Sequence, residues 1–262
     1  MRIAAFVLCL PLLAGGPLYA QAPPTPGAAQ PSVAEHPLVP AIALARKAKD
    51  KAAALNDYEG TFTKKELIGS QMLTQMMKIR VRHKPFSVYM VYAAPNEGRE
   101  VLYDQAQDPD NLIVHEGPGL KSLAGTLNLP IRDPRVLAEA RHPVNDLGIE
   151  RLAELVIQQW EFESKYGEID VKYFPDAKMG QIPCEVLVAT HPRPRKQFPY
   201  HQTRLFIEKS TGLPLRVQNY GFPQQASVDP PLVEDYAYTT LKTNVGLSPV
   251  HFSRTNPDYN FQ

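Results

Sequence analysis

The chain has 262 residues, of which 44% are hydrophobic and 21% charged, and its 28 Lys and Arg face 27 Asp and Glu. A chain of this length can bury one large core or two small ones. Its balanced charge provides no long-range field to attract nucleic acid or an anionic membrane surface, so we predict no nucleic-acid partner.

The N-terminus has the pattern of a secretory leader. Arg2 precedes the apolar run of residues 3–13, which is too short to span a bilayer, and small residues end at Ala20. We predict a signal peptide over residues 1–20 and a periplasmic or secreted location, with an uncleaved anchor as the alternative. Cys9 falls in this leader, so Cys184 is left without a partner for an intramolecular disulfide.

Residues 21–39 are rich in proline and poor in large apolar side chains, which predicts a disordered linker. A single domain over residues 40–262 is expected to follow. Pro40 opens an Ala-rich segment that has helical character and ends before Gly60.

Strand patterns dominate the rest of the chain. Residues 58–68, 77–93, 98–105 and 111–117 show alternation or short apolar runs, and similar patterns return in residues 169–179, 182–192, 203–222 and 234–247. Helical patterns lie between these groups, over residues 133–140 and from about residue 149 to Gly167. The sequence predicts an α+β fold with an antiparallel sheet of about eight to ten strands.

Catalytic motifs are absent from the sequence, which lacks the common hydrolase, phosphate-binding and Cys-x-x-Cys patterns. Its seven histidines are scattered, and Cys184 lies in a strand pattern typical of a buried residue. The acidic pairs Glu161/Glu163 and Glu234/Asp235 are interpreted as solvated surface. We therefore predict no enzyme activity, no metal and no cofactor.

Several stretches resemble an exported domain-of-unknown-function family typical of planctomycete bacteria. They include YEGTFTKKE, IRVRHKPFSVYMVY, HPVNDLGIERL, EKSTGLPLRVQNY and NVGLSPVHFSRTNPDYNF. That family is similar in its strand order, and in the hairpin over residues 208–214, to the LolA-like outer-membrane lipoprotein carriers. The resemblance implies a half-open antiparallel β-barrel whose concave face is covered by helices and binds lipid or acyl chains.

The resulting hypothesis is a non-enzymatic exported protein that holds a lipid, an acyl chain or a lipoprotein in this concave face and serves envelope trafficking. Apolar residues at inward strand positions are expected to line it. The predicted ligand-binding residues are Val81, Phe86, Val88, Met90, Tyr92, Tyr103, Val186, Val188, Leu205, Ile207, Leu215 and Val217.

Two alternatives stay open. A cell-envelope structural or protein-interaction module would have a filled core, and would contact a partner protein through a sheet edge or the C-terminal TNPDYNF segment. A hydrolase of envelope polymers would be favoured by a pocket that contains His142 beside an acidic residue with a strongly shifted pKa. Transient membrane contact is compatible with the carrier hypothesis.

Overall fold

The computed structural model describes residues 35–119, 125–225 and 228–261. The predicted signal peptide, and the predicted linker as far as residue 34, lie outside the described residues. The unit that begins at Glu35 contains all of the described elements. No described helix has both the length and the apolar character needed to cross a membrane.

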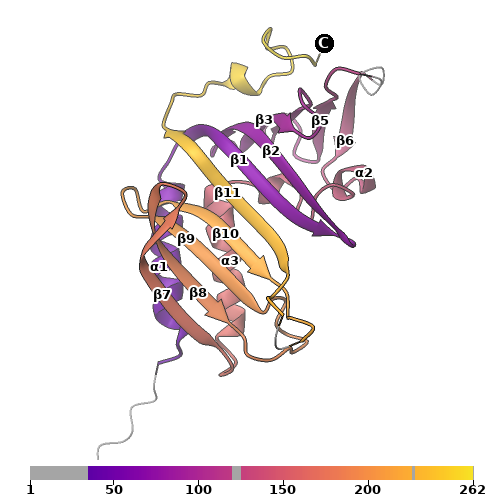
Figure 1. Ribbon diagram of the computed structural model, residues 1–262. Helices are drawn as coiled ribbons and strands as arrows, with labels where there is room; N and C mark the ends of the chain where they lie inside the picture. The colour runs from indigo at the N-terminus through magenta and orange to yellow at the C-terminus, as the bar shows by residue number, and fades with distance from the viewer. Residues whose placement is uncertain (1–34, 120–124, 226–227, 262) are drawn as a thin grey trace, which may run out of the picture. The chain divides into compact units, whose positions relative to one another are not determined.

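A single antiparallel sheet of eleven strands is the framework of this unit (Figure 1). The strands are β1 (Asp57–Ile68), β2 (Gln71–Arg82), β3 (Ser87–Ala94), β4 (Glu100–Asp104), β5 (Asn111–His115), β6 (Thr126–Pro130), β7 (Asp170–Met179), β8 (Ile182–Thr190), β9 (Gln202–Glu208), β10 (Pro214–Tyr220) and β11 (Leu232–Thr243). Their order across the sheet is β6-β5-β4-β3-β2-β1-β11-β10-β9-β8-β7. Since β6 and β7 stand at opposite ends of this order, the sheet curls without closing.

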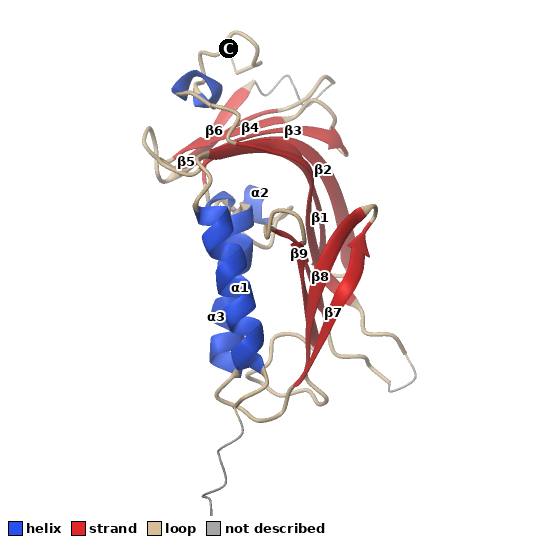
Figure 2. Ribbon diagram, turned by 90° about the vertical axis from the view of Figure 1, so that its left-hand side faces the viewer, coloured by secondary structure: helices blue, strands red, loops and turns tan. Residues whose placement is uncertain are grey.

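Two long helices lie on the concave side of the sheet, as Figure 2 shows. They are α1 (Leu38–Ala53) and α3 (Ile149–Glu163), which pack against each other and against β10. The short helix α2 (Pro134–Leu137) and the 3-10 turn η2 (Val144–Asp146) lie between β6 and α3 in the chain.

Small side chains let α1 approach its neighbours closely. Ala41, Ala45, Ala48 and Ala52 recur at helical spacing and are at most 2% exposed. Tyr hydroxyls from the sheet fix the start of α3, since the Gly148 N–H donates to Tyr238 at 2.9 Å. Gly148 has φ +115°, a conformation that other residues rarely adopt, so glycine is required there.

The C-terminal segment packs on the convex side of the sheet. After the 3-10 turn η3 (Pro249–Phe252), Tyr259 stacks on Tyr89 of β3 at 3.8 Å between ring centroids. Phe261 is fully buried, and Asn260 donates two hydrogen bonds to Glu100 of β4. The TNPDYNF segment therefore covers its own sheet.

The predicted fold class is confirmed: the protein is α+β, with an open antiparallel sheet and helices on its concave face. The expected helix over residues 133–140 is shorter than predicted, because α2 ends at Leu137 and the following residues leave helical geometry to contact the sheet. Strand β6 was not predicted; it is only five residues long and ends in Pro130.

Candidate functional site

A cavity of about 410 Å³ lies between the concave face of the sheet and the α2–α3 region. Two rows of cross-strand partners form much of its sheet wall. One row runs Met90–Val101–Val114–Leu127 across β3 to β6, and the other runs Tyr92–Met77–Phe62–Tyr238 across β3, β2, β1 and β11. Alternation along each strand places these side chains on one face.

The facing wall comes from α2, η2 and the first half of α3. Val136, Val144, Leu147, Leu152 and Val156 line the cavity there. Aliphatic and aromatic side chains therefore dominate both walls. Burial raises the pKa of the lining Tyr92 to about 12, so its phenol stays neutral and adds no charge.

One end of the cavity is polar, and it is built around two glutamates. Glu66 of β1 and Glu234 of β11 are direct cross-strand partners on the concave face, and each is 2% exposed. Two like charges in such positions repel each other unless other groups compensate them. The donors around them are therefore a structural requirement.

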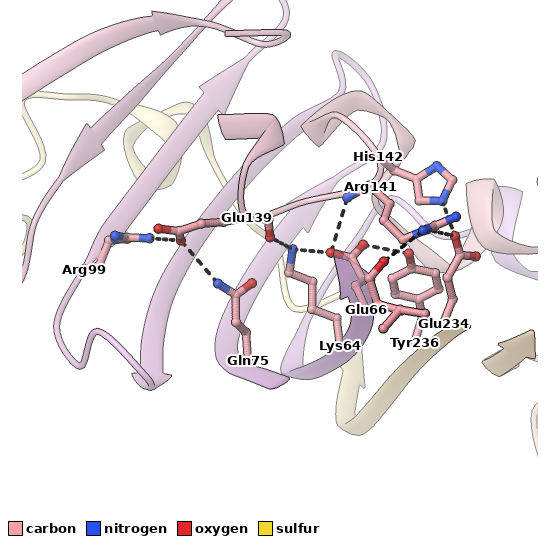
Figure 3. A network of polar contacts seen from close by, with 10 residues as sticks. Lys64, Glu66, Gln75, Arg99, Glu139, Arg141, His142, Glu234 and Tyr236 are labelled. Atoms are coloured by element: carbon pink, nitrogen blue, oxygen red, sulfur yellow. Dashed lines mark hydrogen bonds and ion pairs between the residues drawn. The ribbon is translucent and has the colours of Figure 1, made fainter. Parts of the chain in front are cut away.

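The segment that follows α2 supplies much of this compensation (Figure 3). Arg141 donates from its backbone N–H to Glu66, at 3.3 Å, and from its Nε to Glu234, at 2.6 Å. His142 Nε2 lies 3.2 Å from the same oxygen of Glu234. Residues 139–142 are thereby fastened to both central strands.

Sheet residues complete the network. Glu66 accepts hydrogen bonds from Lys64 at 3.0 Å and from the Tyr236 hydroxyl at 2.7 Å. Lys64 also donates to the carbonyl oxygen of Glu139, and Arg99 donates to the Glu139 carboxylate at 2.6 Å. These contacts link β1, β11 and Arg99, which directly precedes β4, to the segment that follows α2 (Figure 3).

The protonation of the pair follows from these contacts. Burial acts to raise the pKa of Glu234, but hydrogen bonds from His142 and Asn219 and the charge of His142 outweigh it and lower that pKa to about 2. The hydrogen bond to Glu234 raises the pKa of His142 against the opposing effect of burial. The carboxylate is therefore ionised at neutral pH, and the imidazolium form of His142 is favoured.

Three of the twelve predicted ligand-binding residues line the cavity: Met90, Tyr92 and Val217. Most of the others lie in the packed core beside it, at most 8% exposed, or in the case of Phe86 partly buried. They are Val81, Phe86, Val88, Tyr103, Leu205, Ile207 and Leu215. Their ligand-binding role stays a prediction.

Val186 and Val188 were expected on the concave face of the sheet, but the register places them on the opposite face. The register pairs Leu187 with Leu205, which pairs with the cavity residue Val217. Val186 and Val188 point to the other face of the sheet, since side chains alternate along a strand. Both faces of β8 are buried at these positions, so alternation of polarity could not set the phase.

The interpretation of the acidic pairs as solvated surface is wrong for three of the four residues. Glu234 and Asp235 are 2% and 4% exposed, and Glu163 is 1% exposed and lies 3.2 Å from His191. A usable signal existed in the strand phase: Phe62 and Tyr238, taken as inward, place Glu66 and Glu234 on the same inward face.

The His142–Glu234 pair is the feature that the hydrolase alternative required. However, the cavity lining contains no Ser, Thr or Cys among the described residues. Arg141 and Asn219 also occupy the carboxylate, and the raised pKa of His142 favours the imidazolium form, which cannot accept a proton as a general base. No group of three or more His, Cys, Asp or Glu side chains in the described part of the chain is arranged to hold a metal ion.

Comparison with protein families assigns the chain. The model of DUF1571, described as a protein of unknown function, matches residues 55–261. The chain belongs to this family. The predicted membership of a domain-of-unknown-function family is thus confirmed, and the match includes the sheet, α3 and the C-terminal segment. No curated protein matches the sequence.

Solved structures with similar folds include three from different bacteria. Mycobacterium tuberculosis lipoprotein LppX is 13% identical, with 80% of this chain and 98% of that chain covered and a TM-score of 0.45. A LolA superfamily protein from Nitrosomonas europaea is 11% identical, with coverages of 80% and 96% and a TM-score of 0.31. A DUF1329 family protein from Desulfovibrio piger is 19% identical, with coverages of 83% and 97% and a TM-score of 0.38. Because these values are low, no ligand is transferred from these proteins to this chain.

Proposed function

We propose that this DUF1571 protein is an exported, non-enzymatic carrier that holds a lipid, an acyl chain or the lipid part of a lipoprotein in the cavity under its curled sheet. The observation that carries the proposal is the cavity itself. Its volume of about 410 Å³ lies within the range of small-molecule sites, and its walls are mainly aliphatic and aromatic.

The alternative, an envelope structural or interaction module, predicts a filled interior. The cavity of about 410 Å³ argues against it. The C-terminal segment is also a poor candidate for contact with a partner protein, since Tyr259 and Phe261 are 5% and 0% exposed. Export rests on the predicted leader, and the proposed place of action is the periplasm or cell envelope, where transient contact with a membrane would load or release the ligand.

The test is native mass spectrometry with lipid extraction on protein purified from its own cell envelope. We expect a co-purifying lipid in near-stoichiometric amount. Met90→Trp fills the cavity from β3 and should abolish binding, since Met90 is 6% exposed and lines the cavity. Met76→Trp is the matched control: Met76 lies on β2, is 42% exposed and does not line the cavity.

Circular dichroism must show that both variants fold. A wild-type protein that carries no lipid and takes none up from added lipid would contradict the proposal. Turnover of an ester ligand that is lost in His142→Gln would contradict its non-enzymatic part.

A further inference from the structure

A second, more open hollow of about 380 Å³ adjoins the polar end of the cavity. We call it the outer hollow. Its lining residues are Leu67, Ile68, Gly69, Leu137, Ala140, Arg141, His142, Tyr200 and Glu234. Four of them, Ala140, His142, Tyr200 and Glu234, also line the cavity. A wall about one side chain thick therefore separates the two spaces.

The acceptors of this wall are already in use. One oxygen of Glu234 accepts from Arg141 at 2.6 Å and lies 3.2 Å from His142 Nε2, and the other oxygen accepts from Asn219 at 2.9 Å. With its pKa lowered to about 2, this carboxylate is ionised but carries three donors. It has little capacity left for a donor group of a ligand.

The donors of the wall are only partly used. The side chains of Arg141 and His142 are 34% and 36% exposed, whereas that of Glu234 is 2% exposed. His142 turns Nε2 to the carboxylate, and its Nδ1 makes no hydrogen bond to any residue within the described ranges. Tyr200 also lines the outer hollow, and its hydroxyl is a further donor that interacts with Glu234. With His142 protonated, the outer hollow has two cations against one carboxylate.

From this inventory we propose that the outer hollow binds the anionic head group, a carboxylate or a phosphate, of an amphiphile whose apolar chain lies in the cavity. The inference rests on the proposed function and adds the ligand class to it. Arg141, His142 and Tyr200 donate hydrogen bonds to the head group. Hydrogen bonds from a charged donor to an oxyanion are stronger than those between neutral groups. Leu67, Ile68 and Leu137 contact the first part of the chain.

A chain that joins the two spaces must pass between the side chains of the wall. The side chains of Arg141 and His142 are the more exposed ones beside it, so we place the passage next to them and away from the buried Glu234. Arg141 also donates to the Leu67 carbonyl oxygen at the end of β1, at 2.9 Å, so it borders the passage on the sheet side.

The experiment compares four ligands with the same chain: hexadecanoate, hexadecyl phosphate, hexadecanol and hexadecyltrimethylammonium. Their affinities for the full-length protein are measured by displacement of a fluorescent apolar probe, below the concentrations at which the ligands aggregate. We expect at least one anion to bind about tenfold more tightly than hexadecanol, and the cation more weakly. The order of hexadecanoate and hexadecyl phosphate distinguishes a fatty acid from a phospholipid-type head group.

Arg141→Gln should remove the preference for the anions over hexadecanol, so that the ratio of the two affinities falls towards one. Arg195→Gln is the matched control, because Arg195 also pairs with one glutamate, Glu168 at 2.7 Å, but lines neither space. If Arg141→Gln fails to fold, His142→Gln tests the same site and keeps the Arg141–Glu234 pair.

Equal affinities for all four ligands, or tightest binding of the cation, would overturn the head-group site and leave the proposed function standing. Failure of all four to bind would overturn both. An anion preference that persists in Arg141→Gln and in His142→Gln would place the head group elsewhere and contradict the assignment.

Discussion

Two halves of the same sheet differ in what covers their concave face. In the packed half, β7–β10 lie under α1 and α3, and Leu187, Leu205 and Trp160 are completely buried. In the hollow half, β1–β6 and β11 face the four-residue helix α2, the turn η2 and the start of α3, and a cavity of about 410 Å³ remains. Most inward residues are apolar in both halves, so the length of the covering helices decides whether the interior is filled.

The hollow half compensates for its weak cover in two ways. A charged network fastens residues 139–142 to β1 and β11, and the C-terminal segment adds a small second core on the convex face of β3 and β4. The same kind of apolar inward residues therefore surrounds a cavity where the covering segment is attached by specific polar contacts, and forms a filled core where the cover packs densely.

The largest expected effect is that of a leucine truncation in the packed half, which is compared with the same truncation in the hollow half. Leu205→Ala in the packed half should cost about 4 kcal/mol, because it opens a void in a dense core. Leu112→Ala should cost only about 2 kcal/mol, since Leu112 already borders the cavity and has fewer packing partners to lose. Urea denaturation measures both, and equal costs would show that the halves are packed alike.

The second prediction concerns the convex cover. Phe261→Ala should lower the free energy of unfolding by about 3 kcal/mol, because Phe261 is fully buried against β3 and β4. Hydrogen exchange should speed up in β3 and β4 more than in β8 and β9. Phe162→Ala is the control, with a side chain that is 43% exposed, and it should change little. Uniform acceleration across the sheet would contradict a local cover.

The third prediction tests the charged fastening. Glu234→Gln should lower the free energy of unfolding by about 2 kcal/mol, because the substitution removes the anion that Arg141 and His142 share. Both side chains are partly exposed, so water replaces part of the lost interaction. In the wild type the same stabilisation is present above pH 4.5 and is lost as pH falls towards about 2. Glu161→Gln, in an exposed pair with Arg46, should cost less than about 0.5 kcal/mol. Equal losses of stability in Glu234→Gln and Glu161→Gln would show that the buried network stabilises the fold no more than an exposed ion pair does.

The smallest expected effect is the pH dependence due to His142. Its pKa is raised in the folded state, so its contribution is complete below the unfolded value of 6.5 and is lost as pH rises through the folded value. At this partly exposed site the contribution should be about 0.5 kcal/mol. Urea unfolding at about pH 6 and about pH 8.5 should show this loss in the wild type and not in His142→Gln.

The pH dependence of stability due to His83 has to be separated from that due to His142. Burial lowers the pKa of His83, so that residue favours folding as pH rises and opposes the His142 effect. It is present in both proteins, and the difference between them isolates His142. An unchanged pH profile in His142→Gln would contradict the assigned ion pair.

The fold was predictable from the sequence where alternation was clean. Met90 and Tyr92 lie two residues apart on β3 and share a face, and both line the cavity as expected. Residues 182–190 gave no such signal, because β8 is buried on both faces, so the faces of Val186 and Val188 were assigned wrongly.

The polar end of the cavity was the least predictable part. It brings together β1, β11 and the segment after α2, which are far apart in the chain, and only the register shows that Glu66 faces Glu234. The pairing of Arg141 with Glu234 has no local signal in the sequence, because the two residues are 93 positions apart.

Methionine methyl NMR most directly tests the claim that the cavity of the hollow half binds a ligand, since the described methionines lie in both the hollow half and the packed half. Met77 and Met90 line the cavity, Met179 lies in the packed half, and Met72 and Met76 are exposed. On titration with hexadecanoate, we predict shifts at Met77 and Met90 and none at Met179, Met72 or Met76. Shifts confined to the exposed pair, or no shifts at any site, would contradict a ligand-binding cavity in the hollow half.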